Sequence, residues 1–140
     1  MFHRLRRPLY VLLVSAFALL AVAVLWLGFH TQVNFTVQQV ENMITAELPR
    51  NPTQAAVEGW FDKHGIEHDT FSGIVTDHIN GEPVWQTAKL KQDDFRSWTR
   101  GTIPEAERSF LLVKTINVYF FFDQDGKPLT HLVLSHTIGL

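Results

Sequence analysis

The sequence predicts an α+β fold, in which an N-terminal transmembrane helix precedes two short helices that pack on an antiparallel sheet of three or four strands. Three observations predict it. Residues 9–29 form an unbroken run without a charged side chain. Residues 36–64 contain two helix start signals, each followed by apolar residues at helical spacing. Residues 111–138 contain two apolar segments around a glycine-containing turn, a pattern typical of a β-hairpin.

The apolar run at residues 9–29 is long enough to cross a bilayer. As a helix with a rise of ~1.5 Å per residue it would reach roughly 31 Å, which matches the thickness of the hydrocarbon layer. Arg4, Arg6 and Arg7 precede the run, so residues 1–8 are predicted to be a basic tail in the cytoplasm. Residues 30–140 are then one outward-facing domain, periplasmic in a bacterial cell and anchored in the inner membrane.

A cleaved signal peptide is the alternative interpretation of the same run. Residues 16–18 (Ala-Phe-Ala) and 21–23 (Ala-Val-Ala) have the small-x-small pattern that signal peptidases accept. The apolar run continues past both sites through Leu25, Trp26 and Leu27, so we expect the segment to remain attached. The chain has no cysteine, which excludes a lipid-modified N-terminus and any disulfide bond.

The composition of the outer domain excludes several classes of function. All fourteen acidic residues but only nine of the twelve basic ones follow residue 30, and such an acidic surface is unsuited to nucleic acids. The sequence has neither a nucleophile-elbow motif nor a glycine-rich phosphate-binding loop. We therefore expect no enzymatic activity, no cofactor and no small-molecule substrate.

Two helices are predicted ahead of the strands. The first begins at a capping box formed by Thr36 and Gln39 and ends before Pro49. The second begins after Thr53 and ends near His64. The apolar residues that define their buried faces are Val37, Val40, Ile44 and Leu48 in the first helix, and Ala56, Val57, Trp60 and Phe61 in the second. Gly65 is suited to the left-handed conformation of a C-terminal cap, with Ile66 folding back onto the last turn.

The middle of the domain is predicted to contain two strands and a loop. From His68 the apolar residues recur with a period of two through Val75 to Ile79, which predicts a half-buried strand. Asn80 and Gly81 are typical of a tight turn, and residues 84–90 are predicted to return as a strand. Residues 91–109 are polar, with isolated aromatic residues, and are interpreted as a long loop with one helical turn.

The predicted hairpin comprises residues 111–123, a turn, and residues 129–138. One face of its first strand is formed by Ile116, Val118, Phe120 and Phe122. Tyr119 and Phe121 then lie on the opposite face, in a chain with too few elements to cover both faces of a sheet. We expect Tyr119 and Phe121 to be exposed there and to bind a partner, an unidentified envelope protein.

This hairpin resembles that of small, largely uncharacterised bacterial envelope proteins with an N-terminal hydrophobic segment. The residues that carry the resemblance are 116–123 (Ile-Asn-Val-Tyr-Phe-Phe-Phe-Asp), Gly126-x-x-Leu129 and the ending 137–140 (Thr-Ile-Gly-Leu). Two helices followed by an antiparallel sheet are also similar in shape to outer-membrane-assembly lipoproteins of the BamE kind, although this chain lacks their lipid-attachment cysteine. The resemblance implies an envelope protein that binds another protein for assembly, stabilisation or inhibition, and it implies no catalytic residue.

The histidines supply the alternative function. Residues 64–68 (His-Gly-Ile-Glu-His) match the H-x-x-E-H pattern of inverted zinc peptidases, but Gly65 interrupts the helix that this chemistry requires. A simpler hypothesis is a periplasmic metal-binding module that uses His64, His68 and His78. The preferred expectation is that these residues are structural and that no metal is bound.

Overall fold

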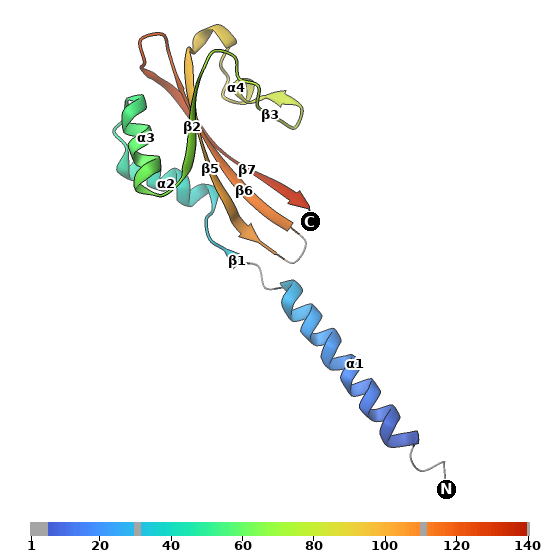
Figure 1. Cartoon of the computed structure of the whole chain (residues 1–140). Coiled ribbons are helices and arrows are strands. Elements are labelled where there is room, and N and C mark those ends of the chain that lie inside the picture. Colours follow the sequence, from blue (N-terminus) through green and yellow to red (C-terminus); the bar gives the residue numbers. More distant parts are fainter. Residues whose placement is uncertain (1–5, 30–31, 110–111, 140) are drawn as a thin grey trace.

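A computed structural model of the chain describes residues 6–29, 32–109 and 112–139 (Figure 1). The elements, in chain order, are α1 (Arg6–Phe29), β1 (Gln32–Val33), α2 (Val37–Glu47), α3 (Gln54–Lys63), β2 (Glu67–Ser72), β3 (His78–Ile79), β4 (Glu82–Pro83), α4 (Val84–Thr87), the 3₁₀ helix η1 (Gln92–Asp94), β5 (Ser97–Arg108), β6 (Leu112–Phe122) and β7 (Pro128–Gly139). The predicted α+β class is confirmed. The first five residues of the expected basic tail lie outside the described residues.

The main sheet is antiparallel and has five strands, which form four positions side by side. Its order is β1-β5-β6-β7, and β2 also pairs with β5. Both β1 and β2 lie on the edge of β5 that β6 leaves free, with Gln32 opposite Arg108 and Glu67 opposite Thr102. An irregular stretch of β5 around Glu105, which has a φ of 50°, separates the two pairings. The predicted sheet of three or four strands is therefore confirmed in its width.

Both helices predicted between residues 36 and 64 are present, and their ends follow the local signals. The Thr36 side chain accepts a hydrogen bond from the Gln39 N–H at 3.2 Å, and the Gln39 side chain accepts one from the Thr36 N–H at 2.9 Å. This reciprocal pair satisfies two otherwise unpaired donors at the start of α2. Thr53 caps α3 in the same way by accepting from the Ala56 N–H. Local side-chain chemistry therefore fixes where both helices begin.

The end of α3 has the predicted glycine cap. Gly65 has a φ of 63°, and the Ile66 N–H donates to the Phe61 carbonyl at 2.9 Å. Ile66 packs against the same apolar cluster that α3 buries. This arrangement is a Schellman motif, which satisfies carbonyl groups at the helix end and turns the chain into β2.

Gly65→Ala is expected to lower the free energy of unfolding by about 1 kcal/mol, because alanine resists a positive φ. A Cβ at this position would meet no atom within 4 Å, so the cost arises from backbone conformation alone. Urea unfolding measures it. Gly59→Ala is the matched control, since its Cβ would also meet nothing within 4 Å but it lies inside α3, where alanine should stabilise. Equal effects of the two substitutions would contradict the cap assignment.

The sheet is covered by a separate apolar cluster on each face. The helix-side core joins α2 and α3 to the sheet through Val40, Ile44, Val57, Trp60, Phe61, Ile103, Ala106, Ile116, Val118, Phe120, Phe122 and Val133. The loop-side core joins residues 73–95 to the opposite face through Val75, Val84, Phe95, Trp98, Tyr119 and Phe121. Figure 1 shows α2 and α3 on one side of the sheet and α4 and β3 on the other.

The predicted pair of strands between residues 68 and 90 is partly wrong. Gly73, with a φ of 89°, follows the end of β2, and the chain then leaves the main sheet. The turn at Asn80 and Gly81 is confirmed, because both residues have positive φ between the short strands β3 and β4. Residues 84–87 form the helix α4 and no returning strand. A short helix allows the apolar residues of this segment to point together into the loop-side core.

The interpretation of residues 91–109 as a loop is also wrong. Only η1 corresponds to the expected helical turn, and residues 97–108 form the central strand β5. Gly101 and Pro104 weaken the strand signal of this polar segment. Its stability comes from non-local pairing, because β5 has neighbours on both edges and buries Trp98 and Ile103 on opposite faces.

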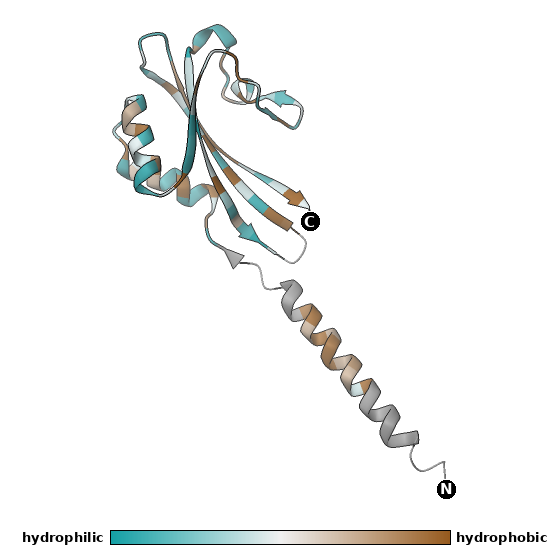
Figure 2. Cartoon of the chain, in the orientation of Figure 1, coloured by the Kyte–Doolittle hydropathy of each residue, from teal (hydrophilic) through white to brown (hydrophobic). Residues whose placement is uncertain are grey.

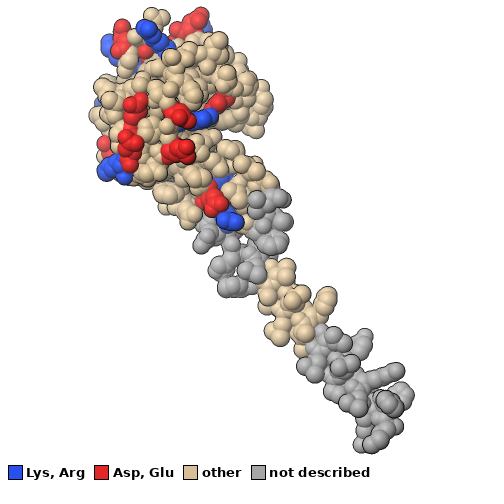
Figure 3. Space-filling model, in the orientation of Figure 1, with Lys and Arg blue, Asp and Glu red and all other residues tan. Residues whose placement is uncertain are grey.

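Helix α1 differs from the rest of the chain in its surface. The side chains of residues 14–25 are all exposed, and they carry no charge. Figure 2 colours this stretch almost entirely as hydrophobic, and Figure 3 shows no Lys, Arg, Asp or Glu on it. Among the described residues, no helix combines the length and the apolar character needed to cross a membrane.

Candidate functional site

The structure buries both residues that were expected to bind a partner. Tyr119 is 2% exposed and Phe121 is 0% exposed, so the expectation that they lie on an open face is wrong. The Phe121 ring lies edge-on to Phe95, with ring centroids 5.3 Å apart. The physical reason is the connection between β2 and β5, which folds over this face of the sheet as the loop-side core. These two residues are therefore part of the packing.

The histidines of the alternative metal site each contact a different group. His64 Nε2 lies 2.8 Å from a Glu47 carboxylate oxygen. His68 Nδ1 lies 3.2 Å from the Ile66 carbonyl, and His78 Nδ1 lies 2.7 Å from the Thr76 carbonyl. Within the part of the chain that the structure describes, no three His, Asp or Glu side chains gather where they could hold a metal ion. The structure therefore does not bring His64, His68 and His78 together at one site.

The best candidate site is a cleft of about 540 Å³, which we call the edge cleft. It lies beside residues 73–95, which we call the covering segment and which pack on the loop face of the sheet, the face of Tyr119 and Phe121. Residues 76–80 form one wall, and β6 and β7 form the other. Its lining residues are Thr76, Asp77, His78, Ile79, Asn80, Asn117, Tyr119 and His136. Most of these side chains can form hydrogen bonds, so the cleft suits a polar ligand.

A polar cluster attaches the covering segment to the sheet beside this cleft. The Asp77 carboxylate accepts hydrogen bonds from Arg100 Nη1 at 2.9 Å and from the Tyr119 hydroxyl at 3.1 Å. Arg100 also lies 3.7 Å from Asp69, and its guanidinium lies 5.5 Å from the centre of the Phe71 ring. Asp77 of the covering segment thus binds Arg100 of β5 and Tyr119 of β6, and these two contacts hold the wall of the cleft in place.

The electrostatics of this cluster favour a structural role. Burial raises the pKa of the Tyr119 phenol above its usual value, and the nearby Asp77 carboxylate raises that pKa further. Tyr119 therefore remains protonated and keeps donating to Asp77. Asp77 in turn is engaged by two donors, so it is not placed as a general base for a substrate. The cleft offers recognition by hydrogen bonds, and its walls hold no nucleophile activated by an adjacent base.

The edge cleft opens beside strand β7, to which His136 belongs. Strand β7 pairs with β6 along its whole length, and no strand among the described residues pairs with its other edge. None of its residues is Lys, Arg, Asp or Glu. Helix α2 contacts its first half, where His131 Nε2 lies 2.8 Å from Glu41. Residues 134–139, which we call the free edge, are half-buried or exposed.

Sequence reasoning missed this edge, although one signal was present. Residues 128–139 lack the charged side chains with which edge strands usually prevent pairing to other chains. Only the topology shows that β7 is the outer strand.

Comparison of the chain with protein-family models, with curated proteins and with solved structures finds no match. The site is therefore defined by its own geometry, which is that of a neutral sheet edge beside a polar cleft.

Proposed function

We propose that this protein is a non-enzymatic, membrane-anchored envelope protein whose outer domain binds an extended segment of another envelope protein. The observation that carries the proposal is the free edge of β7, which is uncharged, unpaired among the described strands and adjacent to the edge cleft. Binding would serve the assembly, stabilisation or inhibition of that partner.

The membrane anchor in the proposal is residues 9–29, with the N-terminus in the cytoplasm and the domain in the periplasm. Two observations support it. The apolar run follows three arginines in the sequence. The described side chains of α1 are exposed on all sides of the helix, and such a surface is stable only against lipid or other apolar groups. The resemblance of the hairpin to small envelope proteins favours the same location.

Strand addition is the mode of binding that the free edge favours. Its backbone N–H and C=O groups can pair with an extended segment, and this pairing supplies affinity with little dependence on sequence. Side chains of the segment that point toward the loop face would enter the edge cleft. There, Asn117 and His136 can form hydrogen bonds with them and so select the sequence that binds.

A different protein fits this edge better than a second copy of the chain. Two β7 strands related by a two-fold axis would pair in antiparallel orientation. In Figure 1, β7 runs toward the end of the sheet that lies near α1, so this antiparallel pairing would direct the two α1 helices in opposite directions. Both helices could not then enter one membrane. The proposal therefore commits to an extended segment of a second, periplasmic protein.

His136→Lys is expected to reduce binding of the partner about tenfold. The substitution places a charge on an exposed residue of the free edge, which is how natural edge strands prevent pairing. The full chain carries a photo-crosslinking residue at position 135 in native membranes, and the yield of the cross-linked partner is measured with and without His136→Lys. Circular dichroism verifies that the substituted domain remains folded.

Ser72→Lys is the matched control, because Ser72 is exposed on β2 at the opposite edge of the sheet. It should leave the cross-linking yield unchanged, and a photo-crosslinker placed at position 72 should not capture the same protein. Equal capture from positions 72 and 135, or a yield unaffected by His136→Lys, would contradict binding at β7.

A further inference from the structure

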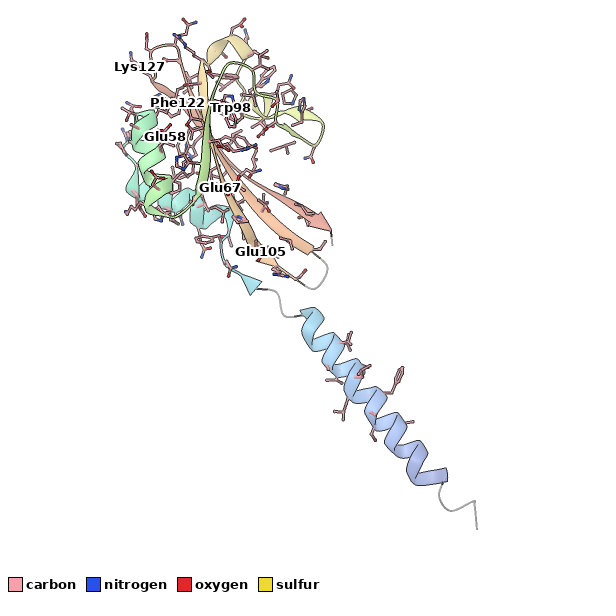
Figure 4. All side chains as sticks on the ribbon, in the orientation of Figure 1. Glu58, Glu67, Trp98, Glu105, Phe122 and Lys127 are labelled. Carbon is pink, nitrogen blue, oxygen red and sulfur yellow. The ribbon has the colours of Figure 1, made fainter. Side chains whose placement is uncertain are left out.

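One end of the main sheet, which we call the base, is defined by where the chain enters the domain. Gln32 of β1 lies opposite Arg108 of β5, which lies opposite Val113 of β6, which in turn lies opposite Ile138 of β7. The start of β1, the end of β5, the start of β6 and the end of β7 therefore meet at the base. In Figure 4, Glu105 is labelled near this end and Lys127 at the opposite end of the sheet.

Exposed apolar side chains gather at the base. Outside α1, the described large hydrophobic residues that are exposed are Phe35, Ile74, Leu112, Leu129 and Ile138. Three of them lie at the base: Phe35 is 39% exposed, Leu112 is 47% exposed and Ile138 is 52% exposed. The Phe35 N–H donates to the Ala106 carbonyl, which places Phe35 beside the end of strand β5. Figure 2 shows the ends of β6 and β7 near α1 coloured as hydrophobic.

The chain length between α1 and the sheet limits how far the base can be from the helix. Helix α1 ends at Phe29 and β1 begins at Gln32. Three residue steps span at most roughly 11 Å when fully extended. If α1 is anchored in a bilayer, the base must therefore lie at the level of the lipid headgroups or directly above them.

The charges at the base are paired with one another. Arg108 lies 3.3 Å from Glu105, and Lys114 lies 2.7 Å from Glu107. The two pairs leave no excess of positive charge to attract anionic headgroups. Contact between this surface and a membrane would thus depend on apolar burial, and a zwitterionic lipid should suffice.

We infer that the base of the sheet rests on the outer surface of the bilayer, with Phe35, Leu112 and Ile138 inserted at the lipid interface. This inference rests on the membrane anchoring proposed above. Apolar side chains at this depth are removed from water, which is favourable by roughly 25 cal/mol per Å² of apolar surface. The contact makes the sheet stand upright on the membrane and presents the free edge and the edge cleft at a fixed height above it.

Because the chain has no cysteine, single cysteines can carry a nitroxide label without further changes. The full chain is reconstituted in phosphatidylcholine vesicles with Ile138→Cys at the base, Leu129→Cys as the control or Leu20→Cys in α1. Leu129 is 40% exposed at the other end of β7, so it matches Ile138 in strand and in exposure. Collision rates with oxygen and with a water-soluble nickel complex report the depth of each label.

The label at position 138 should collide at least about threefold less with the nickel complex than the label at position 129, and the label at position 20 should be inaccessible to nickel. Equal nickel access at positions 138 and 129, with position 20 shielded, would overturn the inference and leave the anchor intact. Free nickel access at position 20 would instead refute the anchor and, with it, the inference.

Discussion

Phe121→Ala is expected to lower the free energy of unfolding by about 3–5 kcal/mol, the usual cost of truncating a fully buried phenylalanine. Phe121 is 0% exposed and lies between Phe95 and Tyr119, with ring centroids 5.3 and 6.5 Å away. Phe95 and Tyr119 are themselves buried, so we expect little of the lost packing to be recovered. A loss of this size would show that the side chains on both faces of β6 belong to a packed core.

Equilibrium urea unfolding of the chain in detergent measures this loss. Leu129→Ala is the control, because it removes an apolar side chain from an exposed position of the same hairpin and should change stability by less than about 1 kcal/mol. A similarly small effect of Phe121→Ala, together with loss of partner binding, would contradict the burial of this residue and favour an exposed aromatic surface on the sheet.

Gly101→Ala is expected to lower the free energy of unfolding by about 2–3 kcal/mol through overpacking. A Cβ added at Gly101 would overlap the ring of Phe61. That ring is 0% exposed and is held between His68 and Phe120, with centroids 5.2 and 6.0 Å away, so it has no space into which to move. The absence of a side chain at Gly101 is what allows α3 to lie directly on the centre of β5.

A double-mutant cycle with Phe61→Leu distinguishes this contact from a general loss of strand stability. Leucine is smaller than the ring and leaves room for the new methyl group. The double variant should therefore be more stable than the sum of the two single effects predicts, by at least about 1 kcal/mol. Additive effects would show that Gly101→Ala acts through the backbone of β5 and not through Phe61.

The parts of the fold that could be predicted are those whose signals are local. The capping box at Thr36, the glycine cap at Gly65 and the turn between β6 and β7 each depend on a few consecutive residues. Steric limits and hydrogen bonding within such a segment decide its conformation before any tertiary contact forms. The two helices and the hairpin were correct for this reason.

The central strand β5 and the covering segment could not be predicted in the same way. The pairing partners of β5 lie far along the chain in β2 and β6, and its own residues are mostly polar. Residues 73–95 bury isolated apolar residues, such as Val75 and Val84, that form one cluster only after the sheet has assembled. The error at 73–95 concealed the edge cleft, one wall of which residues 76–80 form, and it also led to the expectation that Tyr119 and Phe121 are exposed.

The connection from β2 to β5 has a consequence for how binding specificity can change. These strands are antiparallel neighbours, which a turn of two residues could join, yet residues 73–96 intervene and form one wall of the edge cleft. None of the pairings in the main sheet involves residues 73–95, and the helix-side core contains none of them. Substitutions at the exposed residues of this wall, Thr76, His78 and Asn80, can therefore change what the cleft accepts without altering the helices, the main sheet or either apolar core.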